Sequence, residues 1–249
     1  MDVPIALQLY TVRTLLAADF DGVVAQVAAM GYAGVETAGF PGTTPQAAAA
    51  LFKRLGLKVV AVHAPLPTGE MKGEGLETCA ALECSQFIHS GTDRSALKTV
   101  DQVRCYSAML NQINYQLQRE GILLGVHNHW WEFEKAEDQW IYRILLENTD
   151  PSIFFELDTY WIKVAGFDPA AVVQEFGARA HLLHIKDGPG IKDQPNLALG
   201  EGVMNIPQVI QASIYPEWLI VEMDECATDS LVAVKKSFDY LAKIQAKST

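Results

Sequence analysis

The chain has few cysteines, no long apolar run and no basic leader, and each absence narrows what the protein can be. Its 249 residues include four cysteines without CxxC pairing or the spacing of a disulfide framework, so we expect reduced thiols in a cytoplasmic protein. No apolar run reaches the length of about 18 residues that a membrane span needs. The first residues, MDVPIALQLY, contain no basic segment and no small-residue cleavage site, so no signal peptide is expected.

Positive charge is also scarce. The chain carries 19 Lys and Arg against 30 Asp and Glu, a formal net charge of −11 at pH 7. Proteins that bind nucleic acid neutralise its phosphates with Lys and Arg, so this balance argues against a nucleic-acid partner. We expect a neutral or weakly charged small molecule instead, and no membrane partner. The sequence leaves open whether the chain forms a homo-oligomer.

No linker or low-complexity tract divides the chain, and one pattern recurs instead: a short apolar run, a few polar residues, then an amphipathic segment. Strands that alternate with helices predict parallel pairing through right-handed crossovers. The strand-like runs are Pro4–Tyr10, Ala33–Thr37, Leu57–His63, Gln86–Ser90, Ile122–His127, Ile153–Asp158, Ala180–Lys186 and Trp218–Glu222. Eight units of about 30 residues have the size of a (β/α)8 barrel. We predict an α/β fold, a single TIM-barrel domain over residues 1–249. The alternative is a doubly wound open sheet, but the sequence has no GxGxxG motif after the first strand.

Ionisable residues stand at the ends of seven of the eight predicted strands. In a TIM barrel the active site is built at these carboxyl ends. A single histidine there is more often structural, but acids and imidazoles gathered around one buried rim imply a cation between them. These residues are Glu36, His63, His89, His127, Asp158, His184 with Lys186 and Asp187, and Glu222.

The types of donor narrow the expected ion. A mixed set of His, Asp and Glu without cysteine suits Mn2+, Zn2+, Co2+ or Mg2+. Asp158 and Glu222 together neutralise a divalent ion, and neutral His127 and His184 complete four ligands. The sequence therefore predicts one divalent metal at the mouth of the barrel.

The ordered motifs VHAP, IHSG, GILLGVHNHWWEF, ELDTYW, HLLHIKDG and VEMDE resemble the xylose isomerase-like TIM barrels. These are often called sugar phosphate isomerases/epimerases, and they share their fold with AP endonucleases of the same superfamily. In ketose epimerases of this superfamily, Glu, Asp, His and Glu from strands five to eight hold one divalent metal. The resemblance implies that His127, Asp158, His184 and Glu222 hold it here.

The chain departs from the family pattern at two of these motifs. His127 stands where the family pattern has its first glutamate, so the resemblance does not extend to the symmetrical two-glutamate proton shuttle of the epimerases. Glu132 is the residue that could supply the missing carboxylate, and His129 could compete for the metal. Trp161 stands where the DTxH pattern has a histidine that is a metal ligand in the nucleases; together with the acidic charge, this argues against DNA repair.

The expected function is a metal-dependent isomerase or epimerase of a sugar or sugar phosphate. It would act by abstracting the proton next to a carbonyl through a metal-stabilised enediolate. The alternatives are a keto-sugar lyase or dehydratase with the same first step, and a non-catalytic sugar-binding barrel. Glu222 is the expected base, Glu132 the candidate for the opposite face, and Lys186 or His63 the donor toward substrate oxygens. The residues expected to contact substrate are Glu36, His89, His129, Trp130 and Trp161.

Two further features have both a functional and a structural interpretation. The amides of the loop Leu199–Gly202, LGEG, could hold a phosphate or hydroxyl, although an ordinary turn is the better expectation. Glu156 has the same strand parity as Asp158 and could form a buried pair with Lys186.

Overall fold

The computed structural model describes residues 3–67 and 73–247, and in this part of the chain eight parallel strands close into a barrel in the order β1-β10-β9-β8-β5-β4-β3-β2. The prediction of a TIM barrel is confirmed. The barrel strands are β1 Ile5–Gln8, β2 Gly34–Thr37, β3 Lys58–His63, β4 Gln86–His89, β5 Leu123–His127, β8 Phe154–Asp158, β9 Leu182–Ile185 and β10 Trp218–Val221. Each one lies within a run predicted from the sequence.

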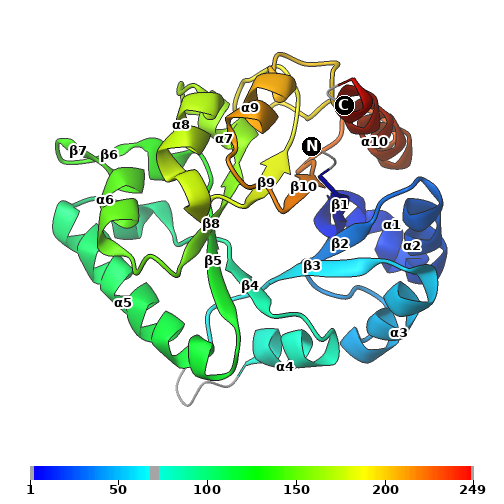
Figure 1. Cartoon of the computed structure of the whole chain (residues 1–249), viewed down its shortest axis with the longest axis horizontal. Helices are drawn as coiled ribbons and strands as arrows, with labels where there is room; N and C mark the ends of the chain where they lie inside the picture. Colours follow the sequence, from blue (N-terminus) through cyan, green and yellow to red (C-terminus); the bar gives the residue numbers. More distant parts are fainter. Residues whose placement is uncertain (1–2, 68–72, 248–249) are drawn as a thin grey trace.

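Helices surround the strands on the outside of the barrel (Figure 1). They are α1 Arg13–Ala18, α2 Phe20–Ala29, α3 Pro45–Leu55, α4 Glu74–Ala81, α5 Val100–Arg119, α6 Ile141–Asn148, α7 Thr159–Val164, α8 Pro169–Phe176, α9 Ile206–Ala212 and α10 Ser230–Ala246. Short elements add η1 Leu9–Val12, η2 Arg94–Leu97, η3 Trp131–Phe133, η4 Gly177–Arg179 and a hairpin of β6 Lys135–Ala136 with β7 Gln139–Trp140. No helix in the described ranges is long and apolar enough to cross a membrane.

Local signals in the sequence set where the helices begin and end. Helix α5 opens with a capping box, in which Thr99 and Gln102 satisfy each other's backbone amides. Helix α3 ends at Gly56, whose φ of +74° is costly for a residue with a Cβ. These ends turn each helix back toward the start of the next strand.

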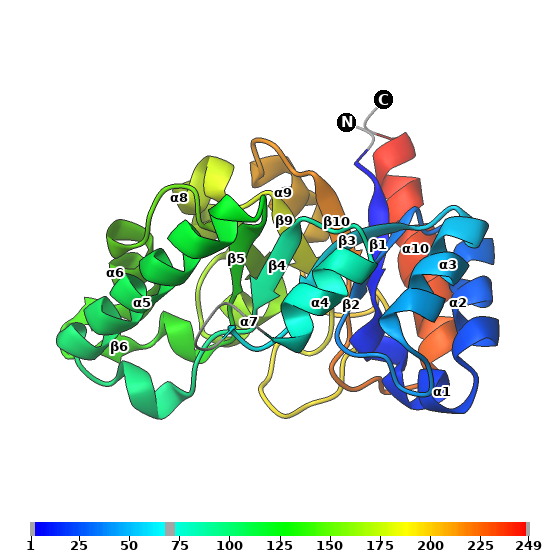
Figure 2. The ribbon, with the colours of Figure 1, turned by 90° about the horizontal axis from the view of Figure 1, so that it is seen from below.

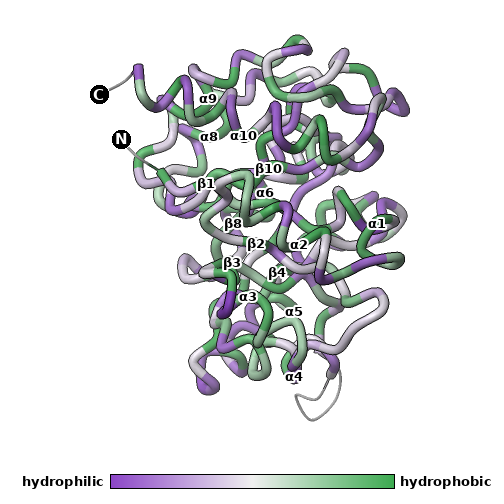
Figure 3. Tube along the Cα trace, turned by 90° about the vertical axis from the view of Figure 1, so that its right-hand side faces the viewer, coloured by the Kyte–Doolittle hydropathy of each residue, from purple (hydrophilic) through white to green (hydrophobic). Residues whose placement is uncertain are grey.

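Two apolar regions hold the barrel together. The larger one fills the space between the strands and the surrounding helices, and the smaller one fills the barrel interior near the strand starts. In Figure 3 green and pale segments run through the middle of the molecule, while most purple segments lie at its edges. The interior cluster consists of Ala6, Val60, Ala61, Ile88, Phe154, Leu182 and Ile220.

The inner face of the barrel changes from apolar to charged along the strands. On β8, Phe154, Glu156 and Asp158 share one face because side chains alternate along a strand. Phe154 belongs to the apolar cluster, and the two acids follow it toward the mouth. Figure 2 shows the chain termini at one end of the barrel and long loops at the other. The charged residues therefore lie at the loop-covered, carboxyl end.

Candidate metal centre and cavity

A cavity of about 670 Å³ opens at the carboxyl end of the strands. The predicted residues that line it are His63, His89, His127, His129 and Glu222. Other predicted residues lie below its floor: Glu36, Asp158, His184 and Lys186 are completely buried. The structure thus separates the strand-end residues into a set that faces the cavity and a set that supports it.

Four side chains, which we call the outer group, meet at this floor: His127, Asp158, His184 and Glu222. One ligand atom from each lies within 4.8 Å of all the others. Strand register explains the meeting, because Asp158 on β8 pairs with His184 on β9. His184 Nδ1 is 2.8 Å from Glu222 Oε2, and His127 Nε2 is 3.9 Å from Asp158 Oδ2. Ligands about 2.1 Å from a tetrahedral ion are about 3.4 Å apart, so this donor set fits one divalent ion.

Asp158 is held from two sides. Its Oδ1 accepts the backbone N–H groups of Tyr160 and Trp161, which caps the start of α7. Its own N–H donates to the side chain of Asn128, 2.9 Å away. Since Oδ1 is committed to the helix, Oδ2 is the oxygen left to face the outer group.

Lys186 supplies the fixed positive charge beneath the cavity. Its Nζ lies 2.8 Å from Asp158 Oδ2, 2.6 Å from Glu222 Oε2 and 2.8 Å from Asp224 Oδ2. The predicted pair with Glu156 is wrong. Lys186 follows His184 by two residues and so lies one step nearer the mouth than His184, with its Nζ beside Asp158 and Glu222.

Glu156 lies one step deeper, among imidazoles. Its Oε2 is 2.7 Å from His63 Nε2, 3.1 Å from His127 Nδ1 and 3.2 Å from His184 Nε2. The shared strand parity of Glu156 and Asp158 indicated from the sequence that Glu156 points inward. The sequence could not identify its histidine partners, because they come from other strands of the closed barrel.

Glu36 is the second deep carboxylate, and it does not line the cavity. Its Oε2 accepts from Gln8 Nε2 at 2.8 Å and lies 2.6 Å from His184 Nε2. Its position gives no support to the expected contact with substrate. Gln8 ends β1, the one barrel strand whose end carries no ionisable group, so no charge pattern in the sequence marked it.

The loop Leu199–Gly202 binds a carboxylate of the chain itself. Asp187 Oδ2 accepts the N–H groups of Gly200 and Gly202, and Oδ1 accepts those of Gly188 and Met204. The interpretation of these amides as a phosphate or hydroxyl site is therefore wrong. The loop is a turn anchored by Asp187, as the structural interpretation expected.

Comparison with known proteins places this geometry in a family. The profile of the xylose isomerase-like TIM barrel family matches residues 24–244. The chain belongs to the xylose isomerase-like TIM barrels. A comparison with curated proteins finds no match.

Solved structures agree with this family over almost the whole chain. A sugar phosphate isomerase/epimerase from Parabacteroides distasonis ATCC 8503 shares 25% identity, with a TM-score of 0.82 over 97% of this chain and 98% of that chain. An L-ribulose 3-epimerase shares 13% identity, with a TM-score of 0.73 over 99% and 97%. The IOLI protein with a bound zinc atom shares 14% identity, with a TM-score of 0.78 over 98% and 99%. The last two likenesses show the fold alone.

In this xylose isomerase-like barrel, two of the buried histidines are strongly basic. Burial lowers the pKa of His63, but the charges of Glu36 and Glu156 outweigh burial and raise it to about 10. Burial likewise lowers the pKa of His184, and Glu156, Glu222 and Glu36 raise it well above its ordinary value. Without a metal, both imidazoles therefore carry protons that balance the buried carboxylates.

The pKa values of the two outer acids are shifted in opposite directions, although Lys186 lowers both. Burial would raise the pKa of Glu222, but Lys186 and His184 hold it well below the ordinary value. Burial dominates at Asp158 and raises its pKa, although Lys186 opposes this. Glu222 is thus the carboxylate of the cavity floor that is ionised most readily.

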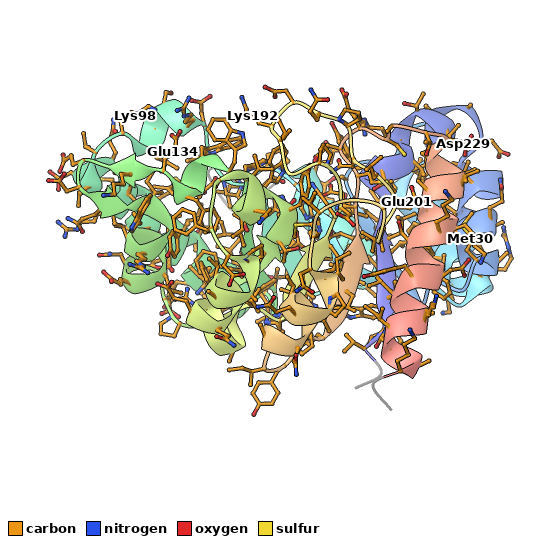
Figure 4. The ribbon with its side chains drawn as sticks, turned by 90° about the horizontal axis from the view of Figure 1, so that it is seen from above. Met30, Lys98, Glu134, Lys192, Glu201 and Asp229 are labelled. Carbon is orange, nitrogen blue, oxygen red and sulfur yellow. The ribbon has the colours of Figure 1, made fainter. Side chains whose placement is uncertain are left out.

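Of the two tryptophans expected to contact substrate, Trp130 lies beside the cavity and Trp161 does not. Trp130 and Trp131 line a second, shallower hollow next to the cavity, together with His129. His129 stacks on Trp131, with ring centroids 4.0 Å apart. Figure 4 places Lys192 at the loop-covered end of the barrel, and its Nζ lies 4.6 Å from the Trp130 ring. Trp161 lines neither hollow.

Glu132 contacts the backbone of the rim residue His129. Its Oε2 accepts the backbone N–H of His129 at 2.8 Å, and its side chain is buried. Gly91, with a φ of +77°, leaves room for Glu132, because a Cβ there would meet Oε1 at 2.8 Å. Glu132 does not line the cavity; its proposed proton transfer stays a prediction that this position does not favour.

Proposed function

We propose that the protein is a divalent-metal-dependent sugar isomerase or epimerase. The outer group carries this proposal, because two carboxylates and two imidazoles converge on one point at the cavity floor. The likeness to the isomerase/epimerase from Parabacteroides distasonis and to a zinc-containing barrel supports it. A divalent ion bound there would supply Lewis-acid polarisation of a sugar carbonyl. His127, Asp158, His184 and Glu222 would hold it.

Glu222 is the proposed base for the proton next to the carbonyl. It lines the cavity, and its depressed pKa leaves it ionised at neutral pH and able to accept a proton. Lys186 cannot reach the cavity, since its side chain is completely buried under three carboxylates. Its proposed role is to hold Glu222 in its ionised form.

His63 is the proposed acid on the other side of the cavity. It lines the cavity, and its raised pKa keeps it protonated at neutral pH. His63 Nδ1 lies 3.1 Å from Ser90 Oγ, another cavity residue. The ring can therefore pass a proton to a substrate oxygen, either directly or through this hydroxyl.

This unequal pair also favours a second candidate, a keto-sugar lyase or dehydratase. A symmetrical epimerase needs equivalent groups on both faces, whereas elimination needs one base and one acid. Glu222 and His63 supply one of each. A probable 3-DHS dehydratase, 14% identical, has the same fold at a TM-score of 0.75.

The substrate is proposed to lack a phosphate. Among the described residues that line the cavity there is no Lys or Arg, whereas Glu74, Glu222 and Asp224 all line it. A phosphate dianion would face these three carboxylates, opposed among the described lining residues by the single positive charge of protonated His63. The Asp187 loop supplies no amides for it either.

Proton exchange tests the proposed function directly. Metal-loaded protein is incubated in D2O with unphosphorylated ketoses and 3-keto sugars, and deuterium at the carbon next to the carbonyl is followed by NMR. We expect incorporation with the wild type and a rate about 10²–10⁴-fold lower with Glu222→Gln at equal metal occupancy. Glu77→Gln, an exposed carboxylate of α4 that does not line the cavity, is the control.

The products separate the two candidates. Recovery of an isomer or epimer supports the first, and an unsaturated product formed with loss of water supports the second. Sugar binding with neither exchange nor product would leave the sugar-binding barrel as the function.

A further inference from the structure

The two deep carboxylates, Glu36 and Glu156, lie directly against the two histidines of the outer group. Both acids are completely buried, and their side chains show 0% exposure. Glu36 Oε2 is 2.6 Å from His184 Nε2, and Glu156 Oε2 is 3.1 Å from His127 Nδ1. Each histidine therefore has a carboxylate on its inner side.

The other ring nitrogen of each histidine faces the outer group. His184 Nδ1 lies 2.8 Å from Glu222 Oε2, and His127 Nε2 lies 3.9 Å from Asp158 Oδ2. A neutral imidazole has one N–H and one lone pair. Ionised Glu36 and Glu156 can only accept hydrogen bonds, so the ring nitrogen beside each of them carries a proton. The proton on His184 Nδ1, which faces Glu222, would leave when an ion binds, and the lone pair of each ring would then face the outer group.

We infer that Glu36 and Glu156 are positioning residues that select the metal-binding tautomers of His184 and His127. This inference rests on the proposed function, and it assigns Nδ1 of His184 and Nε2 of His127 as the ligating atoms. Carboxylates that accept the second N–H of a ligating histidine fix its ring and raise its basicity. Glu156 thus supplies, one step deeper, the charge missing where His127 stands in place of a glutamate.

A second ion is the competing interpretation of the same residues. His63, His127, Glu156 and His184 also have ligand atoms within 4.8 Å of one another. However, all three imidazoles approach a single oxygen, Glu156 Oε2, at 2.7, 3.1 and 3.2 Å. These are N–H···O distances, and the oxygen takes the central place that an ion would need.

The tautomers can be read directly from the wild-type protein. Long-range 1H–15N spectra of the Zn2+-loaded chain should show His184 protonated at Nε2 and His127 protonated at Nδ1. The reverse tautomer at either ring would overturn the assignment for that ring. This measurement needs no variant, so it holds even if a substitution prevents folding.

Metal titration then tests whether the carboxylates act through the histidines. Calorimetry with Zn2+ or Mn2+ should give one equivalent for the wild type, and an affinity about 10–100-fold lower for Glu156→Gln or Glu36→Gln. Glu77→Gln, which removes an exposed carboxylate of α4 outside the cavity, should bind as the wild type does. In a His184→Gln background, Glu36→Gln should add little further loss, because Glu36 contacts no other side chain of the outer group.

Three outcomes would overturn the inference, and they are distinguishable. Two equivalents in the wild type, one of them lost in Glu156→Gln, would make Glu156 a ligand of a second ion. Unchanged affinity in both Gln variants would remove the positioning role and leave the proposed function intact. No metal bound by the wild type would remove both the inference and the metal-dependent function.

Discussion

Lys186 Nζ lies 2.6 Å from Glu222 Oε2, and the lysine side chain is completely buried. Asp158 and Asp224 each lie 2.8 Å from the same Nζ. The fixed cation of the site is therefore bound to both carboxylates of the outer group.

Replacing Lys186 by Met should leave these carboxylates without their partner. Breaking a buried ion pair costs about 3–5 kcal/mol, and we expect a loss of this size in the free energy of unfolding without metal. Saturating Zn2+ should reduce the loss, because it returns positive charge to Asp158 and Glu222. Urea unfolding with and without Zn2+ measures both. The control is Lys192→Met at an exposed position, which should change the free energy of unfolding by no more than about 0.5 kcal/mol. Equal stability of Lys186→Met and the wild type would contradict the ion-pair account.

Metal affinity should rise with pH. Carboxylates raise the pKa of His184 well above its ordinary value despite its burial, so the metal-free ring holds a proton that must leave before Nδ1 can bind an ion. Proton and ion compete, and affinity should increase about tenfold per pH unit for each proton displaced, up to that raised pKa. Calorimetry in two buffers of different ionisation enthalpy counts the released protons. A pH-independent affinity would argue against His184 as a ligand.

Asp187→Asn should loosen the loop that Asp187 anchors. The carboxylate accepts four backbone N–H groups, and an amide leaves part of them facing its own NH2. We expect a cost of about 1–3 kcal/mol and faster hydrogen exchange at Gly200 and Gly202. Asp193→Asn, at an exposed position of the same segment, is the control. Unchanged exchange at Gly200 would show that the loop does not depend on Asp187.

A free ketose should bind better than its phosphate ester. The described lining of the cavity contains three carboxylates and neither Lys nor Arg, with protonated His63 as its cation, so the net charge of the lining disfavours the ester. We expect at least about tenfold weaker binding of the ester, since like charges brought together cost several kcal/mol. Competition binding with matched pairs of sugars measures the ratio, and tighter binding of the ester would reject the unphosphorylated substrate.

No abasic-site cleavage is expected. The net charge of −11 opposes DNA binding, and Trp161 stands where the nuclease pattern has a ligating histidine. An abasic duplex incubated with the protein and Zn2+ or Mn2+ should remain intact. Efficient cleavage that disappears in Asp158→Ala would reverse this expectation.

The barrel and the outer group were both accessible from the sequence, for one physical reason. Parallel strands end on the same side of a closed sheet, so residues that end predicted strands must converge. The order of the strands therefore placed His127, Asp158, His184 and Glu222 together from the sequence alone, as the structure does. The metal that they would hold is a proposal. Alternation along β8 likewise predicted that Glu156 points inward.

Only the tertiary structure decided which charges meet. The partners of Lys186 and Glu156 depend on strand register and on how far each residue lies along the barrel axis, and the sequence specifies neither. Glu132 was expected in the cavity, but the turn at η3 directs it to the backbone of His129. The sequence also left the amides of the Leu199–Gly202 loop open to a bound anion, because it does not show that the connection between β9 and α9 folds back and places the Asp187 carboxylate among them.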